Sequence, residues 1–229
     1  TTFSPVNGAT SVAVDSNITL TFNEAVRLTN DSALDDSNVD ALITLKENNS
    51  SGSDIAFDAT INGGKTVITI NPSSDFSSEQ VIYVAIGTSV EDTSNNAINA
   101  ASVTFTAVDN AAPTTTFSPL DNATSVAVDS NITLTFNEAV RLTNDSALDN
   151  SNVDALITLK EDNSSGSDIS FDATINGGKT VITINPSSDF SSEQVIYVAI
   201  GTTVEDAADN AINAANVTFT AVDTSAPTM

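Results

Sequence analysis

The sequence predicts an all-β protein made of two tandem antiparallel β-sandwiches. Short runs of alternating apolar and polar residues recur along the chain, which is the pattern of half-buried strands. Glycine and proline fall between these runs, and no stretch has the spacing of a long amphipathic helix. The whole pattern also occurs twice, so each half is expected to fold as a sandwich of its own.

The repeat is an internal duplication with an offset of 114 positions. Residues 11–26 return unchanged as residues 125–140, and the register holds without a gap to the end of the chain. About 13 of the 114 aligned positions differ, and most of these are polar exchanges in expected loops. We therefore predict one domain over residues 1–112 and a second over residues 113–229.

The first part of each repeat is expected to hold three short strands. Residues 2–5 predict an edge strand, because the proline at its end cannot donate to a ladder. Residues 11–14 continue it after a glycine turn, and residues 17–23 alternate clearly between apolar and polar side chains. Residues 24–38 carry no strand pattern, although residues 32–36 could form one helical turn.

The middle of each repeat predicts a strand followed by a hairpin. Residues 39–46 alternate again, except that Leu42 falls on the polar face. Residues 55–61 and 65–70 are separated by Asn-Gly-Gly, and Asn-Gly between alternating runs is the strongest short hairpin signal.

The last part of each repeat predicts two more strands. Residues 80–86 are the most hydrophobic run and are expected to lie in the centre of a sheet. Residues 87–99 are a polar connection, and residues 101–108 form the last strand. Seven to eight short strands without a long helix are typical of an immunoglobulin-like sandwich.

The charge of the chain limits its partners. It has 30 acidic and 6 basic residues, and its formal net charge is −24. Such a surface repels nucleic acid and anionic lipid and attracts cations. No apolar run approaches the roughly 20 residues of a membrane span. We expect a monomer that binds no nucleic acid, inserts in no membrane and contacts mainly neighbouring repeats of its own chain.

The residue types that are missing argue against an enzyme. The chain has no cysteine and no histidine, which excludes disulfides, thiolate metal sites and a Ser-His-Asp arrangement. Carboxylate pairs could suggest a glycosidase, but no tryptophan accompanies them. An isopeptide crosslink would need a buried lysine, and the first repeat offers only Lys46 and Lys65.

Three motifs resemble one family. The run Phe-Ser-Pro followed by Ala-Thr-Ser-Val-Ala-Val-Asp-Ser-Asn, within residues 3–26, resembles the opening of bacterial Ig-like domains of the S-layer type. Residues 90–97 resemble the late Asp-x-x-x-Asn turn of that family, and the Asp-x-x-Ala-Pro-Thr junction is similar to linkers of giant repeat adhesins. The resemblance implies an extracellular spacer at the bacterial cell surface, often stiffened by calcium. Residues 222–228 echo residues 108–114, so we also expect a longer array with a third unit.

Calcium is the ligand for which the sequence argues most strongly. In an Ig-type path, acidic residues at the end of one repeat face acidic loops at the near pole of the next, and these would repel unless a cation lay between them. We therefore expect a Ca²⁺ site at the junction of the two repeats. Its expected carboxylate ligands are Asp15, Asp109, Glu138, Asp145, Asp149, Glu205 and Asp206, and Asp223 is the counterpart of Asp109 at the far end.

Two alternatives stay open. The acidic loop of residues 30–40 could bind calcium within a repeat, or it could be a solvated loop, because it lacks the glycine and closing glutamate of an EF-hand.

The function that we expect is a non-catalytic structural spacer of a secreted bacterial adhesin or surface protein. The alternative is an Ig-like module that itself binds carbohydrate or a host protein.

Overall fold

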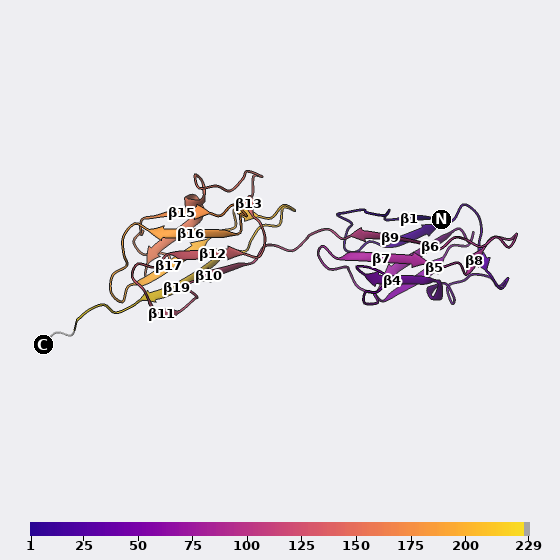
Figure 1. Cartoon of the computed structure of the whole chain (residues 1–229), viewed down its shortest axis with the longest axis horizontal. Helices are drawn as coiled ribbons and strands as arrows, with labels where there is room; N and C mark the ends of the chain where they lie inside the picture. The colour runs from indigo at the N-terminus through magenta and orange to yellow at the C-terminus, as the bar shows by residue number, and fades with distance from the viewer. Residues whose placement is uncertain (227–229) are drawn as a thin grey trace. The chain divides into compact units, whose positions relative to one another are not determined.

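The computed structural model describes residues 1–226, and the chain divides into two compact units (Figure 1). The first unit is Thr1–Asn110 and the second is Ala111–Met229. The predicted echo of the linker at the end of the chain falls partly on residues 227 and 228, which lie outside the described residues.

One sheet of the first unit has four antiparallel strands in the order β1-β2-β6-β5. Its central pair, β2 and β6, places Ile18 opposite Ile70 and Leu20 opposite Ile68, so apolar residues of both strands share one face. The strands are β1 (Thr2–Ser4), β2 (Ile18–Thr21), β5 (Phe57–Ile61) and β6 (Val67–Pro72).

The opposite sheet has three strands in the order β4-β7-β9. The most hydrophobic run of the sequence, β7, lies between the other two strands, which confirms the central position expected for it. Arg27–Leu28 (β3) and Val90–Glu91 (β8) form a separate two-stranded ladder at one end. The strands of the three-stranded sheet are β4 (Ile43–Glu47), β7 (Val81–Ile86) and β9 (Ala101–Thr106).

The second unit repeats this architecture. Its sheets have the orders β10-β12-β16-β15, β11-β19-β17-β14 and β13-β18. The first sheet holds β10 (Thr115–Ser118), β12 (Ile132–Phe136), β15 (Phe171–Ile175) and β16 (Val181–Pro186). The second holds β11 (Ala123–Val126), β14 (Ile157–Glu161), β17 (Val195–Ile200) and β19 (Ala215–Ala221). The small ladder joins β13 (Arg141–Leu142) to β18 (Val204–Glu205).

Each unit has its own core between its sheets. In the first unit, Ile18 and Leu20 from one sheet and Ile82 and Val84 from the other are fully buried. A T-shaped aromatic pair closes one end, with ring centroids 5.8 Å apart for Phe76 and Phe105. The all-β fold predicted from the alternating pattern is therefore confirmed in both repeats.

Four local expectations were wrong. In the first unit, residues 11–14 form no strand and make only an isolated bridge from Val12 to Ala107. Residues 24–38 and 87–99 do contain strands, β3 and β8, but two residues are too few to show any alternation. The helical turn expected at residues 32–36 is absent, and a 3₁₀ turn, η1 (Asp40–Leu42), occurs instead. This turn explains Leu42, because residues that precede β4 do not follow the period of a strand. The second unit has the same turn, η2 (Val153–Leu156).

None of the helices among residues 1–226 is long and apolar enough to cross a membrane.

Candidate functional site

The linker segment, residues 109–114, enters the second unit just before β10. Pro113 is buried, although it lies in a connection rather than a strand. The backbone N–H of Thr114 donates to Asn137 Oδ1 at 2.6 Å, and the Thr114 carbonyl accepts from the Asn137 backbone N–H at 3.2 Å. The end of the linker is therefore fixed to the loop that follows β12.

Asp206 sits in the loop after β18, where it organises its own turn. Its Oδ1 accepts from the backbone N–H groups of Ala208 at 2.7 Å and Asn210 at 3.0 Å. Its Oδ2 accepts from Asn210 Nδ2 at 2.9 Å. The Asp-x-x-x-Asn motif is thus a self-capped turn, and it holds Asp206 in place with only 1% of its surface exposed.

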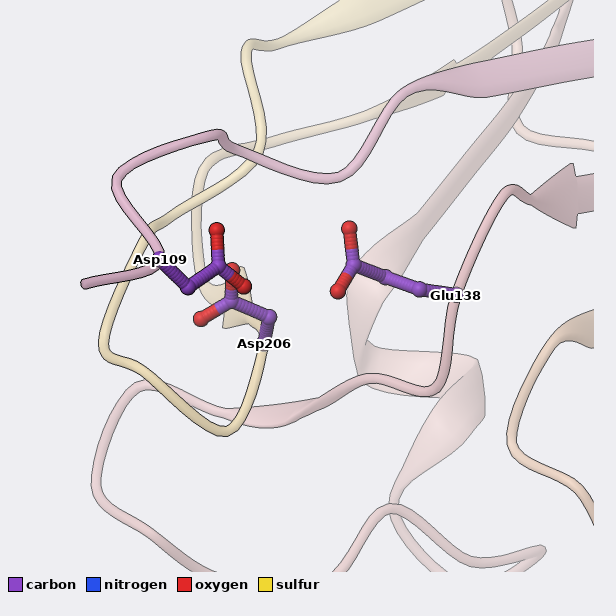
Figure 2. Close-up of side chains that lie close together, drawn as sticks. All are labelled: Asp109, Glu138 and Asp206. Carbon is purple, nitrogen blue, oxygen red and sulfur yellow. The ribbon is translucent and has the colours of Figure 1, made fainter. Parts of the chain in front are cut away.

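Three carboxylates gather beside this turn. Figure 2 shows Asp109, Glu138 and Asp206 with their carboxylates directed toward one another. One oxygen of each lies within 4.8 Å of the others, Asp206 is buried, and the other two are partly buried. Like charges at this spacing repel in a partly desolvated site, whereas a divalent cation takes this kind of oxygen ligand. The structure therefore brings together three of the seven predicted ligands.

Two further predicted ligands, Asp145 and Glu205, lie in a different cluster, around Arg141. Arg141 Nη2 is 2.8 Å from Asp145 Oδ1, and Arg141 Nε is 3.2 Å from Glu205 Oε1. Asp209 completes this group and also pairs with Arg141. Burial acts to lower the pKa of Arg141, but Asp145, Asp209 and Glu205 together raise it above its ordinary value. The cation among these carboxylates is therefore a guanidinium of the protein itself.

The sequence analysis did not single out Arg141, Asp209 or Pro113. A signal was available for the arginine, because it recurs as Arg27 in a chain with only 6 basic residues. Asp209 is one of the exchanged positions, since the first repeat has Asn95 there and Arg27 Nη2 donates to the oxygen of Asn95 at 2.5 Å.

The remaining two predicted ligands, Asp149 and Asp15, belong to neither carboxylate cluster of residues 1–226. Asp149 accepts from the Ser151 hydroxyl at 2.6 Å and from its backbone N–H at 2.8 Å. The hydroxyl contact is the main reason that the pKa of Asp149 is lowered. Asp15 is exposed.

The acidic loop of residues 30–40 supports the neighbouring strand β5. Asp36 Oδ1 accepts from the Ile61 backbone N–H at 2.8 Å, and Asp40 Oδ1 accepts from that of Ala59 at 2.8 Å. In the second repeat, Asn150 Oδ1 accepts from the Ile175 backbone N–H at 2.9 Å. An amide oxygen thus replaces the carboxylate, so this position needs an acceptor rather than a charge.

The lysine considered for a crosslink makes an ion pair instead. Lys46 Nζ lies 2.5 Å from Asp54 Oδ1, and the side chain of Asp54 is 87% exposed. Lys65 follows the hairpin turn with a positive φ of 54°.

The paired sheets, the short strands and the duplication define a tandem of immunoglobulin-type sandwiches. The chain belongs to the bacterial Ig-like domain family, whose model matches residues 1–107 and 109–221. This confirms the expectation of bacterial Ig-like domains in two tandem copies. Asp109, Glu138 and Asp206 all lie within the second matched range.

Several solved structures match the chain at low sequence identity and low TM-score. CopC from Methylosinus trichosporium OB3b is 14% identical with a TM-score of 0.35, over 51% of this chain and 99% of that one. The N-terminal part of the bacterial S-layer protein SbsC is 11% identical with a TM-score of 0.33, over 94% of this chain and 43% of that one. InvD from Yersinia pseudotuberculosis is 14% identical with a TM-score of 0.34, over 99% and 59%. No curated protein sequence matches the chain.

Proposed function

We propose that this chain is a non-catalytic structural spacer, namely two extender repeats of a secreted bacterial adhesin or other cell-surface protein. The observation that carries the proposal is the duplication itself. Two sandwiches that differ at about 13 of 114 positions follow each other in one chain, and each has its own buried core. A spacer gains length from every added copy, whereas an enzyme gains little from an adjacent copy.

The composition supports a role outside the cell. The net charge of −24 keeps a protein soluble and discourages self-association, which suits a monomeric spacer whose partners are its neighbouring repeats. The lack of cysteine lets such a domain fold without depending on the redox state of its surroundings. Membership of a bacterial Ig-like family agrees with both points.

We further propose that a calcium ion binds at Asp109, Glu138 and Asp206. Their oxygens lie within 4.8 Å of one another, and Asp206 is almost completely buried. Asp206 already accepts three hydrogen bonds within its own turn, and a cation would offset the repulsion among the three carboxylates. Ca²⁺ prefers carboxylate and carbonyl oxygens in irregular geometry. A bound ion would hold the linker against the second repeat and limit bending between repeats.

Calorimetric titration with Ca²⁺, together with small-angle scattering in calcium and in chelator, tests this function. We expect binding of calcium and a larger maximum dimension when it is bound. Asp109→Asn should weaken the binding by at least about tenfold, since it removes one charged ligand. Asp145→Asn is the matched control, because Asp145 pairs with Arg141 and should leave calcium binding unchanged.

Two results would count against the proposal. If chelator changes neither the scattering nor the melting temperature, calcium does not stiffen the chain. If the scattering is that of two freely jointed domains in every condition, the chain is not a spacer of defined length.

A further inference from the structure

The first unit has a cavity beside the start of β1. Its volume is about 400 Å³, and its lining includes the apolar side chains of Phe22, Val26 and Ile98. Two acidic side chains, Glu24 and Asp92, also line it. Asn23, Asn96 and Asn99 line it as well, so the cavity offers both apolar and polar surface to a short segment of chain.

The same residues occur in the second unit, where some of them are more deeply buried. The equivalents of Ile98 and Asp92 are Ile212 and Asp206, and these are only 2% and 1% exposed. Ile98 and Asp92 themselves are only partly buried. Every cavity-lining residue from Phe22 to Ala101 is identical in the two repeats, so the difference does not come from the lining itself.

The linker segment lies beside the equivalents of these residues in the second unit, because Thr114 bonds to Asn137 and Asp109 lies near Asp206. In the second unit it leads directly into β10, with Pro113 buried and Thr114 bonded twice to Asn137. The exchanged residues nearby are exposed and lie outside the set that lines the cavity of the first unit; they are Ala207, Ala208, Asp209 and Asn216.

We propose that the cavity of the first unit is a docking site for a second copy of this linker, with the sequence Asp-x-x-Ala-Pro-Thr. The residue that would bind its threonine is already in position. Asn23 Nδ2 donates to Glu24 Oε1 at 3.4 Å, and Asn137 Nδ2 donates to Glu138 Oε1 at 3.3 Å, so the two amides have the same orientation.

The sequence of the linker suits such a site. Proline has a fixed φ and loses little conformational freedom on binding, and its ring is apolar enough for a cavity that contains Phe22, Val26 and Ile98. A docked copy would also place its aspartate near Glu24 and Asp92, as Asp109 lies near Glu138 and Asp206. Such docking would be the contact by which one repeat engages the next, so it extends the proposed spacer function. It rests on that function only because it needs a further repeat to supply the second linker.

The test adds one copy of residues 108–114, Val-Asp-Asn-Ala-Ala-Pro-Thr, before Thr1 of the full chain. The probe is hydrogen exchange at the backbone N–H of Ile98, which donates to the Val90 carbonyl at 2.9 Å. The matched N–H of Ile212 donates to the Val204 carbonyl, also at 2.9 Å, so the two amides start from the same hydrogen bond. Peptides from the two repeats can be distinguished by mass, because residues 93–95 differ from residues 207–209.

We expect the extension to slow exchange at Ile98 by about tenfold, to the rate found at Ile212. An extension with its proline replaced by aspartate should leave Ile98 unchanged. In the unextended chain, Pro113→Asp should raise exchange at Ile212 to the rate at Ile98, without unfolding the second unit, because Pro113 lies outside the strands that form its core.

The proposal is overturned if neither extension slows exchange at Ile98, or if both slow it equally, since the second result would show only non-specific coverage. The measurement is made in chelator and does not depend on calcium. If Ile98 becomes protected while scattering still shows freely jointed domains, the docking site stands and the spacer function fails.

Discussion

The two repeats share nearly the same sequence but differ at one end of the sandwich. In the second repeat, Phe117 and Ile212 belong to the buried core, whereas their equivalents Phe3 and Ile98 are only packed against its edge. At the other end, Phe76 and Phe105 make the same T-shaped contact as Phe190 and Phe219, with centroids 5.8 and 5.7 Å apart.

The comparison separates what a repeat contributes by itself from what the preceding linker contributes. The core between the sheets is the same in both copies, so it depends only on the strands of each repeat. We infer that the deeper burial of Ile212 and Asp206 depends on the linker segment, which lies before β10. A domain boundary drawn at β10 would therefore remove part of the second repeat's own packing.

The largest effects are expected in the shared core, where they should be equal. Phe105→Ala and Phe219→Ala each remove a side chain that is 1% exposed, and each should cost about 4 kcal/mol of unfolding free energy. Urea unfolding followed by tyrosine fluorescence measures this, because each repeat has one tyrosine, Tyr83 or Tyr197. A difference of more than about 1 kcal/mol between the two costs would mean that the cores are not equivalent.

The next largest effect should differ between the repeats. Ile212→Ala removes a side chain that is 2% exposed and should cost about 3 kcal/mol. Ile98→Ala should cost about half as much, roughly 1.5 kcal/mol, because Ile98 is already partly exposed. The same urea experiment measures both variants. Equal costs would contradict the claim that the linker completes the core of the second repeat.

The strands could be predicted because their alternating pattern is local. β2 and β6 follow a period of two, β7 is a short continuous apolar run, and the Asn-Gly turn fixes the hairpin between β5 and β6. The ladders β3–β8 and β13–β18 could not be predicted in this way. Each strand has two residues, and each ladder is held by an arginine–glutamate pair 64 positions apart in sequence.

The candidate site could be predicted only in part, for a related reason. The strand path of a sandwich determines which loops share a pole, so the sequence placed Asp109 near Glu138 and Asp206. It could not show that Asp145 and Glu205 pair with Arg141, because that depends on side-chain geometry. The burial of Pro113 could not be predicted either, because it lies in a connection with no strand period.

A smaller difference should appear at the two arginines. Arg141→Met leaves Asp145, Glu205 and Asp209 close together without their cation, whereas Arg27→Met leaves only Asp31 and Glu91. The urea midpoint should therefore fall more for Arg141→Met than for Arg27→Met, and less than for Ile212→Ala. Adding Asp209→Asn to Arg141→Met should recover most of the difference. If Asp209→Asn leaves the urea midpoint unchanged, the third carboxylate is not the cause of the difference between the two arginine variants.

The smallest effects should appear on acidification, and they should be the same in both repeats. Hydrogen bonds from Ser37 and Ser151 lower the pKa of Asp35 and Asp149 below 3.8 in the folded state. A carboxyl whose pKa is lowered by folding stabilises the protein above its unfolded pKa, and this contribution is lost as the pH falls through the folded pKa. Ser37→Ala and Ser151→Ala should each raise the pKa of the neighbouring aspartate toward its ordinary value. Carbon NMR titration of the two carboxyls measures the shifts. A shift in only one repeat would contradict the equivalence of the two acidic loops, because both serines make the same contacts, hydroxyl and backbone N–H, with their aspartate.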